Sequence, residues 1–328
     1  MDKRWWIIFL ATMMSIGCLG NDWGMHWIKC QEATSDEQVW FRNVVLLDGR
    51  PSMARISVAS QGNFILYVNG YNVCLDVLAP YGDRDDRTLI ARDVEVTQYL
   101  RPGSNIIAVW YSPRHGNATY CDKQLSLTFY GHHDQLHYSF SFHTDEGWSC
   151  RPACATSISS CSTNDIFPVD SRKQLTESFD NSQYESDWNV SDTTVMGWNH
   201  AVSCPRALPS QNITEQKFDY QSLQVHKIRT GQLDFSRPTH PICQFGHPFK
   251  GWIRVTIRGM HKGDTLRIGD YRYVCSGELD EQACQRFTLF DSPSGNVEIS
   301  SSRPLTSDNI VQAEALDIKP CRHHSFRY

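Results

Sequence analysis

The sequence has 328 residues, of which 40% are hydrophobic and 12% aromatic. Lys and Arg together number 31 against 36 Asp and Glu, so the net charge is −5, and the basic residues form no block. We expect no nucleic-acid partner, because that affinity comes from clustered cations. A charged fraction of 20% also excludes a coiled coil or a long polar disordered chain. The length accommodates two domains, or one large β-domain.

Residues 1–20 have the order of a secretory signal peptide. A basic start precedes an apolar run from Trp5 to Met14, and small residues follow. The tetrapeptide from Ser15 to Cys18 resembles a bacterial lipobox, in which Cys18 would carry the lipid; the alternative is ordinary cleavage nearby, with Cys18 incidental. We expect export to the periplasm, or an outer-membrane lipoprotein of a Gram-negative bacterium. Contact with the membrane would then be made only through the lipid anchor.

Alternation of apolar and polar residues predicts short β-strands along the chain. In the first half the runs lie at 55–59, 64–68, 105–111, 125–129 and 136–143. The last two form a predicted hairpin with an aromatic face inward and a polar face outward. In the second half the runs lie at 251–259, 265–268 and 271–275. Since no segment sustains a helical stripe over three turns, the fold class is all-β, built as sandwiches or barrels.

The stretch 155–216 alternates poorly and is rich in Ser, Thr, Asn and Asp. We expect it to form long ordered loops that pack on a sandwich. Its aromatic anchors are Phe167, Tyr184, Trp188 and Trp198. Prolines cluster at 205–212, which predicts one domain over 21–210 and a second over 211–328.

The segment 54–111 carries more than a generic strand pattern. It contains a Tyr-Val-Asn-Gly turn at 67–70, Asp-Val-Leu-Ala-Pro at 76–80 and a Val-Thr-x-x-Leu-Arg-Pro-Gly-x-Asn series at 96–105. In this order the elements resemble the N-terminal galactose-binding-like β-sandwich, or jelly roll, of bacterial α-L-rhamnosidases. Similar short motifs of that family occur at 27–28, 39–42, 144–148, 197–198, 244–252 and 258–264. The sequence departs from the family at Glu95, which lengthens a turn, and at Gln244 and His247-Pro248.

The resemblance implies two β-sandwich domains and a function in carbohydrate recognition. In the enzymes these sandwiches precede an (α/α)6 barrel that carries the acidic catalytic residues, and this sequence has no helical-barrel pattern. We therefore expect a non-catalytic carbohydrate-binding accessory protein of bacterial glycan degradation, with no catalytic residue to assign. Two alternatives stay open: an α-L-rhamnosidase-like hydrolase or its truncated or split subunit, and a structural platform for a separate catalytic subunit.

An acidic loop is the first candidate ligand site. Asp83, Asp85 and Asp86 lie close together, and carboxylate oxygens suit Ca²⁺. The resemblance implies that such a loop can bind rhamnose through calcium, so Ca²⁺ is the one cofactor we expect. The glycan partner would be a rhamnose- or galactose-containing polysaccharide. The alternative is a solvated turn in which Arg84 and Arg87 neutralise the acids.

Trp110 and Tyr111 are the candidate sugar-stacking residues. They follow an apolar run at the place where the rhamnosidase module has a Gly-x-Gly-Trp-Tyr loop, although the glycines here have shifted. Aromatic faces stack against the C–H surfaces of sugars. The alternative for both rings is core packing.

Two further clusters favour structural interpretations. Glu278, Asp280 and Glu281 could supply a carboxylate pair for glycoside hydrolysis, but a charged hairpin tip is favoured. The histidines at 132, 133 and 137 have only Asp134 as a nearby further ligand, so a loop without a metal is favoured.

The cysteine count is odd once Cys18 is set aside, since 12 − 1 = 11 cysteines remain. At least one thiol is then free or paired between chains. Cys150, Cys154 and Cys161 lack partners for a structural zinc site, which favours a disulfide among these three.

Overall fold

The computed structural model describes residues 26–34, 37–81, 88–113, 125–161, 174–190, 197–204, 212–216 and 220–323. Within these ranges the chain is all-β, with two short 3-10 helices at Thr97–Tyr99 and Asn181–Gln183. No helix in the described ranges is long and apolar enough to cross a membrane. The predicted signal peptide and Cys18 lie outside the described residues. The predicted all-β sandwich class is confirmed.

The first sandwich consists of two packed sheets. One has the order β14-β1-β8-β3-β6-β15, with β9 paired to β8. Its strands are β1 (Ile28–Lys29), β3 (Met53–Ser60), β6 (Thr88–Glu95), β8 (Leu125–His133), β9 (Tyr138–His143), β14 (Val202–Ser203) and β15 (Asn212–Gln216). The other has the order β13-β10-β2-β7-β4-β5. Its strands are β2 (Val39–Leu47), β4 (Asn63–Val68), β5 (Tyr71–Asn72), β7 (Gly103–Ser112), β10 (Ser149–Pro152) and β13 (Asn199–His200).

The second sandwich also has two sheets. The larger has the order β11-β12-β21-β20-β24-β18-β17. Its strands are β11 (Thr156–Cys161), β12 (Gln174–Asp180), β17 (Gln232–Asp234), β18 (Ile242–Gln244), β20 (Thr265–Ile268), β21 (Tyr271–Val274) and β24 (Asn296–Ser301). The smaller has the order β16-β25-β19-β22, with β23 paired to β19. Its strands are β16 (Gln221–Thr230), β19 (Phe249–Arg258), β22 (Asp280–Cys284), β23 (Phe290–Ser292) and β25 (Ile310–Arg322).

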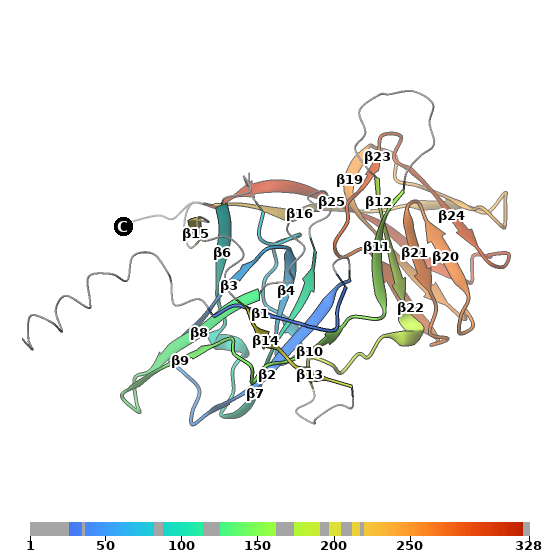
Figure 1. The fold of residues 1–328 in the computed structure, drawn as a ribbon. Helices are drawn as coiled ribbons and strands as arrows, with labels where there is room; N and C mark the ends of the chain where they lie inside the picture. The colour runs from blue at the N-terminus through green and yellow to red at the C-terminus, as the bar shows by residue number, and fades with distance from the viewer. Residues whose placement is uncertain are drawn as a thin grey trace, which may run out of the picture.

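The chain crosses between the sandwiches more than once. β11 and β12, coloured green, lie among the orange strands of the second sandwich in Figure 1, where β12 runs parallel to β21. β15 returns to the first sandwich and runs parallel to β6. A bridge between Val77 and Leu223 then joins the first sandwich to β16. The expected boundary at 210–211 therefore does not coincide with a division between sheets.

The expectation of loops over 155–216 is wrong for the strands β11 to β15, of which β11 and β12 are the longest. The aromatic anchors of this stretch nevertheless pack as expected. Trp188 is buried, and Tyr184 and Trp198 are partly buried against the same hydrophobic cluster, whereas Phe167 lies outside the described residues. Trp188 stacks on Trp40 of β2 with ring centroids 4.9 Å apart.

Strand β7 is buried on both faces, which explains why its sequence is a continuous apolar run rather than an alternating one. Ile107 and Val109 belong to the core of the first sandwich. Ile106, Ala108 and Trp110 point to the other side and join the core of the second sandwich. The six-stranded sheet is thus the shared middle layer of the molecule.

Two positions require glycine for steric reasons. Gly70 follows Asn69 in the β4–β5 turn, and both residues have positive φ, as the two-residue turn signal predicts. Gly251 lies in β19 directly beside β25, where an added Cβ would be 1.9 Å from the carbonyl oxygen of Leu316. A side chain at position 251 would force these two strands apart.

Candidate functional site

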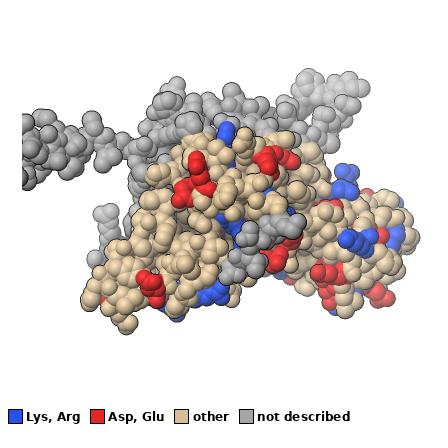
Figure 2. All heavy atoms as spheres, turned by 60° about the horizontal axis from the view of Figure 1, so that its bottom comes forward, with Lys and Arg blue, Asp and Glu red and all other residues tan. Residues whose placement is uncertain are grey.

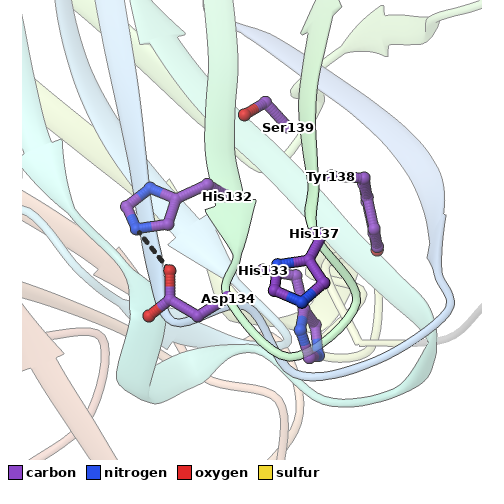
Figure 3. Close-up of a pocket in the computed structure, with 6 residues that line it drawn as sticks. All are labelled: His132, His133, Asp134, His137, Tyr138 and Ser139. Atoms are coloured by element: carbon purple, nitrogen blue, oxygen red, sulfur yellow. Dashed lines mark ion pairs between the residues drawn. The ribbon is translucent and has the colours of Figure 1, made fainter.

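A polar hollow lies at the tip of the β8–β9 hairpin, the hairpin that the alternating sequence predicts. Its volume is about 470 Å³, and it opens widely to solvent. Figure 3 shows His132 and Asp134 on one side and His133, His137 and Tyr138 grouped on the other. The lining residues are His132, His133, Asp134, His137, Tyr138 and Ser139.

His133 is held in one orientation by its surroundings. The backbone N–H of Leu136 donates to its Nδ1 at 3.2 Å, so the neutral ring carries its proton on Nε2. The ring stacks on Tyr138 with centroids 5.9 Å apart. Gly49, in the connection between β2 and β3, lies against the ring, and a Cβ added there would be 2.6 Å from Nε2. A fixed ring forms hydrogen bonds at a lower entropic cost than a mobile one.

The other polar groups of the hollow face solvent. His132 Nε2 lies 3.4 Å from Asp134 Oδ1, with side-chain exposures of 42% and 73%. The backbone N–H of Asp134 donates to Ser52 Oγ at 3.0 Å, which ties the turn to the neighbouring strand β3. His137 adopts a positive φ of 52°, a conformation that histidine tolerates better than most residues.

This arrangement suits a ligand with many hydroxyl groups. Imidazole nitrogens, a carboxylate and the hydroxyl of Ser139 offer both donors and acceptors within one open hollow, and Tyr138 adds an aromatic ring. Among the described residues, no group of three or more His, Cys, Asp or Glu is arranged to hold a metal ion. The sequence marks these histidines only as a metal-site candidate. The sequence pattern that marks the hollow is the clustering of His132, His133 and His137 around the tip of a predicted hairpin.

Beside the hollow, β9 carries a row of aromatic side chains at the sheet edge. Phe129 of β8 is buried and packs against Phe140 with ring centroids 5.0 Å apart. Phe140 in turn lies 5.7 Å from Phe142, which is 37% exposed. The aromatic face predicted to turn inward is therefore only partly covered, since Phe129 is buried and Phe142 is exposed.

The sequence-predicted ligand residues have different outcomes. Asp83, Asp85 and Asp86 lie outside the described residues. Trp110 is 0% and Tyr111 2% exposed. The expectation that these two rings stack on a sugar at the surface does not fit this structure, which has the core packing that the sequence left open.

Trp110 lies where the two sandwiches meet. Its Nε1 donates to Gln38 Oε1 at 2.7 Å. Its ring packs edge-on against Phe287, with centroids 5.8 Å apart, and the guanidinium of Arg286 lies 5.3 Å from the ring centroid. Both faces of β7 are covered, so the Trp110 side chain cannot reach solvent in any rotamer.

Of the acidic cluster Glu278, Asp280 and Glu281, Glu278 is exposed ahead of β22, whereas the other two do not project as the charged hairpin tip that the sequence favours. Asp280 is paired with Arg258 at 2.6 Å on the surface. Glu281 is buried, and its carboxylate accepts hydrogen bonds from Tyr273, Asn181 and the backbone N–H groups of residues 276 and 277. Burial opposes ionisation of Glu281, but these hydrogen bonds outweigh it and lower its pKa. Both carboxylates are thus occupied by structural partners.

A second polar network, which the sequence does not signal, joins the first sandwich to β16 and the chain after β25. Arg92 donates to Asp76 Oδ2 at 2.8 Å, and its guanidinium lies 3.8 Å from the ring centroid of Tyr220. Tyr220 stacks on His323 with centroids 4.3 Å apart. His323 Nε2 lies 2.8 Å from Ser222 Oγ. Asp76 of the Asp-Val-Leu-Ala-Pro motif therefore anchors Arg92, and Arg92 makes the contact with Tyr220 just before β16.

Cys30, Cys150 and Cys154 are free thiols in this structure. Cys150 is buried, whereas Cys154 is exposed and its Sγ lies 3.5 Å from the carbonyl oxygen of Pro152. The structure gives no pairing between these two, and the side chain of Cys161 is not described. The expected disulfide within this trio is therefore not present between Cys150 and Cys154.

The face of the molecule in Figure 2 shows no large patch of one charge over its described part. On the face in Figure 2, acidic and basic residues are interspersed over the described part of the molecule. A ligand approaching this face would therefore meet neither a strongly positive nor a strongly negative electrostatic potential.

Comparison with solved structures shows the same fold in three α-L-rhamnosidases. The enzyme from Dictyoglumus thermophilum matches with a TM-score of 0.75 and 18% identity, over 91% of this chain and 36% of that one. The enzyme from Aspergillus terreus matches with a TM-score of 0.71 and 16% identity, over 89% and 36%. The Streptomyces avermitilis enzyme, solved with L-rhamnose, matches with a TM-score of 0.67 and 17% identity, over 86% and 28%.

This chain therefore spans about a third of the length of those structures. No curated protein matches it in sequence. The profile of the α-L-rhamnosidase N-terminal domain, however, matches residues 49–226, which is more than half of the chain. The protein belongs to the α-L-rhamnosidase N-terminal domain family.

Proposed function

We propose that the protein is a carbohydrate-binding accessory protein of glycan degradation. The observation that carries the proposal is the family match over residues 49–226, in a chain whose fold corresponds to about a third of a rhamnosidase. Among the described acidic candidates, Asp280 and Glu281 are engaged in structural contacts, which favours binding over hydrolysis. The rhamnose bound by the Streptomyces avermitilis enzyme makes rhamnose-containing glycans the first ligands to test.

The sugar contacts that we propose lie in the hollow of the β8–β9 hairpin. His132, Asp134 and His137 offer polar atoms to sugar hydroxyls, and Tyr138 offers part of its ring. The fixed orientation of His133 supports this choice, since a preorganised group loses little entropy on binding. The partly exposed ring of Phe142 extends the aromatic surface along the same strand.

The acidic loop remains a separate proposal. Asp83, Asp85 and Asp86 would bind Ca²⁺ and through it a sugar, as hard oxygen ligands do. Binding in the hairpin hollow would be independent of calcium. The two proposed sites therefore differ in their response to a chelator.

Affinity electrophoresis of the full chain in gels containing rhamnose-rich or galactose-rich polysaccharide tests the function. We expect retardation in at least one gel, and release of reducing sugar should stay at the level of the buffer. Absence of retardation in every gel would overturn the binding proposal. Sugar release that is lost in Asp85→Ala or Glu278→Ala would instead favour the hydrolase alternative.

Three variants locate the site. His132→Ala and Asp134→Ala should abolish the part of the retardation that persists in EDTA if the hollow binds the sugar. Asp85→Ala should abolish only the part that EDTA removes. His247→Ala, an exposed histidine of the second sandwich, is the matched control and should bind like the unmodified protein. Unchanged binding in the two hairpin variants would exclude the hollow.

We also propose that the protein is exported and anchored through a lipid on Cys18. The proposal is supported by the order of residues 1–20 alone. Metabolic labelling with a palmitate analogue should label the unmodified protein, and Cys18→Ser should lose the label. Labelling that persists in Cys18→Ser would place the lipid elsewhere, and absence of label in both would exclude the anchor.

A further inference from the structure

Two cysteines that lie far apart in the sequence meet in the core of the first sandwich. Cys30 directly follows β1, in the seven-stranded sheet, and Cys150 lies in β10, in the six-stranded sheet. Their exposures are 4% and 0%, and both belong to the same hydrophobic cluster. The two thiols are hydrogen-bonded to each other. The contact therefore lies between the two facing sheets.

The pair differs chemically from the other buried thiols. The hydrogen bond from Cys150, which outweighs the opposing effect of burial, lowers the pKa of Cys30 to about 7. In contrast, burial raises the pKa of Cys243 and Cys284, each to about 12. In the folded protein Cys30 therefore has a second sulfur in contact with it, which sets it apart from Cys243 and Cys284.

We propose that Cys30 and Cys150 form a disulfide that links the two sheets of the first sandwich. The two thiols lose two electrons and two protons as the S–S bond forms. The oxidant is a disulfide such as oxidised glutathione. The Cys30 thiolate attacks it and expels one thiolate, and the Cys150 thiolate then displaces the second from Cys30. Because the core encloses both sulfurs, the exchange takes place while the segment around β1 is still undocked.

This pairing replaces the one that sequence spacing favours. Cys154 lies on the surface, with its Sγ directed at the carbonyl oxygen of Pro152, whereas Cys150 points into the core. Neighbouring strands constrain both partners of the proposed bond. Ile28 pairs with Ser203 in one sheet and Cys150 pairs with Phe41 in the other, so each side of the contact is fixed within its own sheet.

Peptide mapping of the full chain tests the proposal. The protein is denatured, refolded in a glutathione buffer, treated with iodoacetamide and digested with trypsin without reduction. Cleavage after Lys29 and Arg42 releases peptide 30–42 with Cys30 as its only cysteine. We expect this peptide linked to peptide 124–172, with a mass two hydrogen atoms below the sum, and separated after reduction. Recovery of alkylated Cys30, or of Cys30 linked to another peptide, would overturn the proposal.

Peptide 124–172 also contains Cys154 and Cys161, so variants assign the partner. The linked species should persist in the double variant Cys154→Ser, Cys161→Ser and be lost in Cys150→Ser. Persistence of the link in Cys150→Ser would refute the assignment. If Cys150→Ser does not fold, tandem mass spectrometry of the unmodified cross-link still decides which cysteine is joined. A urea midpoint that rises on oxidation in the unmodified protein, and not in Cys30→Ser, is the expected consequence.

Discussion

Removal of the buried carboxylate of Glu177 should loosen the second sandwich. Glu177 lies in β12, is 1% exposed, and accepts hydrogen bonds from the backbone N–H groups of Arg286, Phe287 and Thr288 at 3.0–3.1 Å. The hydroxyl of Thr288 donates a further one at 3.0 Å. These bonds hold the connection between β22 and β23 against a strand that comes from far earlier in the chain. In Glu177→Ala, four buried donors lose their acceptor.

The size of the effect follows from that count. A buried donor without an acceptor costs about 1–3 kcal/mol. Because water enters the vacated space, we take the lower end for each of the four donors, which gives a loss of about 4 kcal/mol in the free energy of unfolding. With a urea m-value of about 3 kcal/mol/M, the midpoint of unfolding should fall by roughly 1 M.

Urea denaturation followed by tryptophan fluorescence measures the midpoint, and amide hydrogen exchange measures protection at residues 286–288. The control is Glu278→Ala, which removes an exposed carboxylate of the same sandwich. We expect a lowered midpoint and faster exchange at 286–288 in Glu177→Ala only. If both variants show the same midpoint and the same protection, the carboxylate does not hold the connection and the reasoning fails.

Three further predictions follow from packing and hydrogen bonding. Trp110→Ala should lower the free energy of unfolding by about 3–5 kcal/mol, because a fully buried indole is removed. The folded variant should still be retarded by glycan. Loss of retardation at unchanged stability would show that Trp110 belongs to the binding site. The pKa of Glu281 is lowered in the folded protein, so its carboxylate stabilises the fold above the ordinary glutamate pKa, and this contribution is lost as the pH falls through the lowered value. In Glu281→Gln, the decrease of stability at acidic pH should therefore be less steep. An unchanged decrease would contradict the role of Glu281. Gly251→Ala should prevent pairing of β19 with β25 and yield little soluble protein, and near-normal thermal stability would show that Leu316 can move aside.

The sequence predicts the strands with clear alternation, because each has one buried and one exposed face. The runs at 64–68 and 265–268 correspond to β4 and β20 within one residue. β12 is missed because Glu177 occupies an inward position between Leu175 and Phe179, and a buried carboxylate disguises the apolar alternation. Its acceptor role depends on backbone amides more than a hundred positions later, which no local pattern contains.

The same limit applies to the candidate site. The sequence predicts the β8–β9 hairpin but assigns its histidines no binding role, because the hollow depends on packing of Gly49 and Ser52, from the β2–β3 connection, against the hairpin. The apolar run before Trp110 predicts a strand and cannot reveal that both its faces are covered. That double coverage is a tertiary property, and it moves Trp110 from the expected surface to the junction of two cores.

The crossing of the chain between the sandwiches also constrains the order in which the protein can fold during synthesis. β15 must emerge before the first sheet is complete, yet β11 and β12 emerge before it and must wait for β21. In that interval Phe179 and the carboxylate of Glu177 lack the partners that later cover them. Folding one domain at a time, starting from the N-terminus, is therefore not open to this chain. A nascent chain stalled near residue 216 should expose the β11–β12 hairpin to chaperones and proteases.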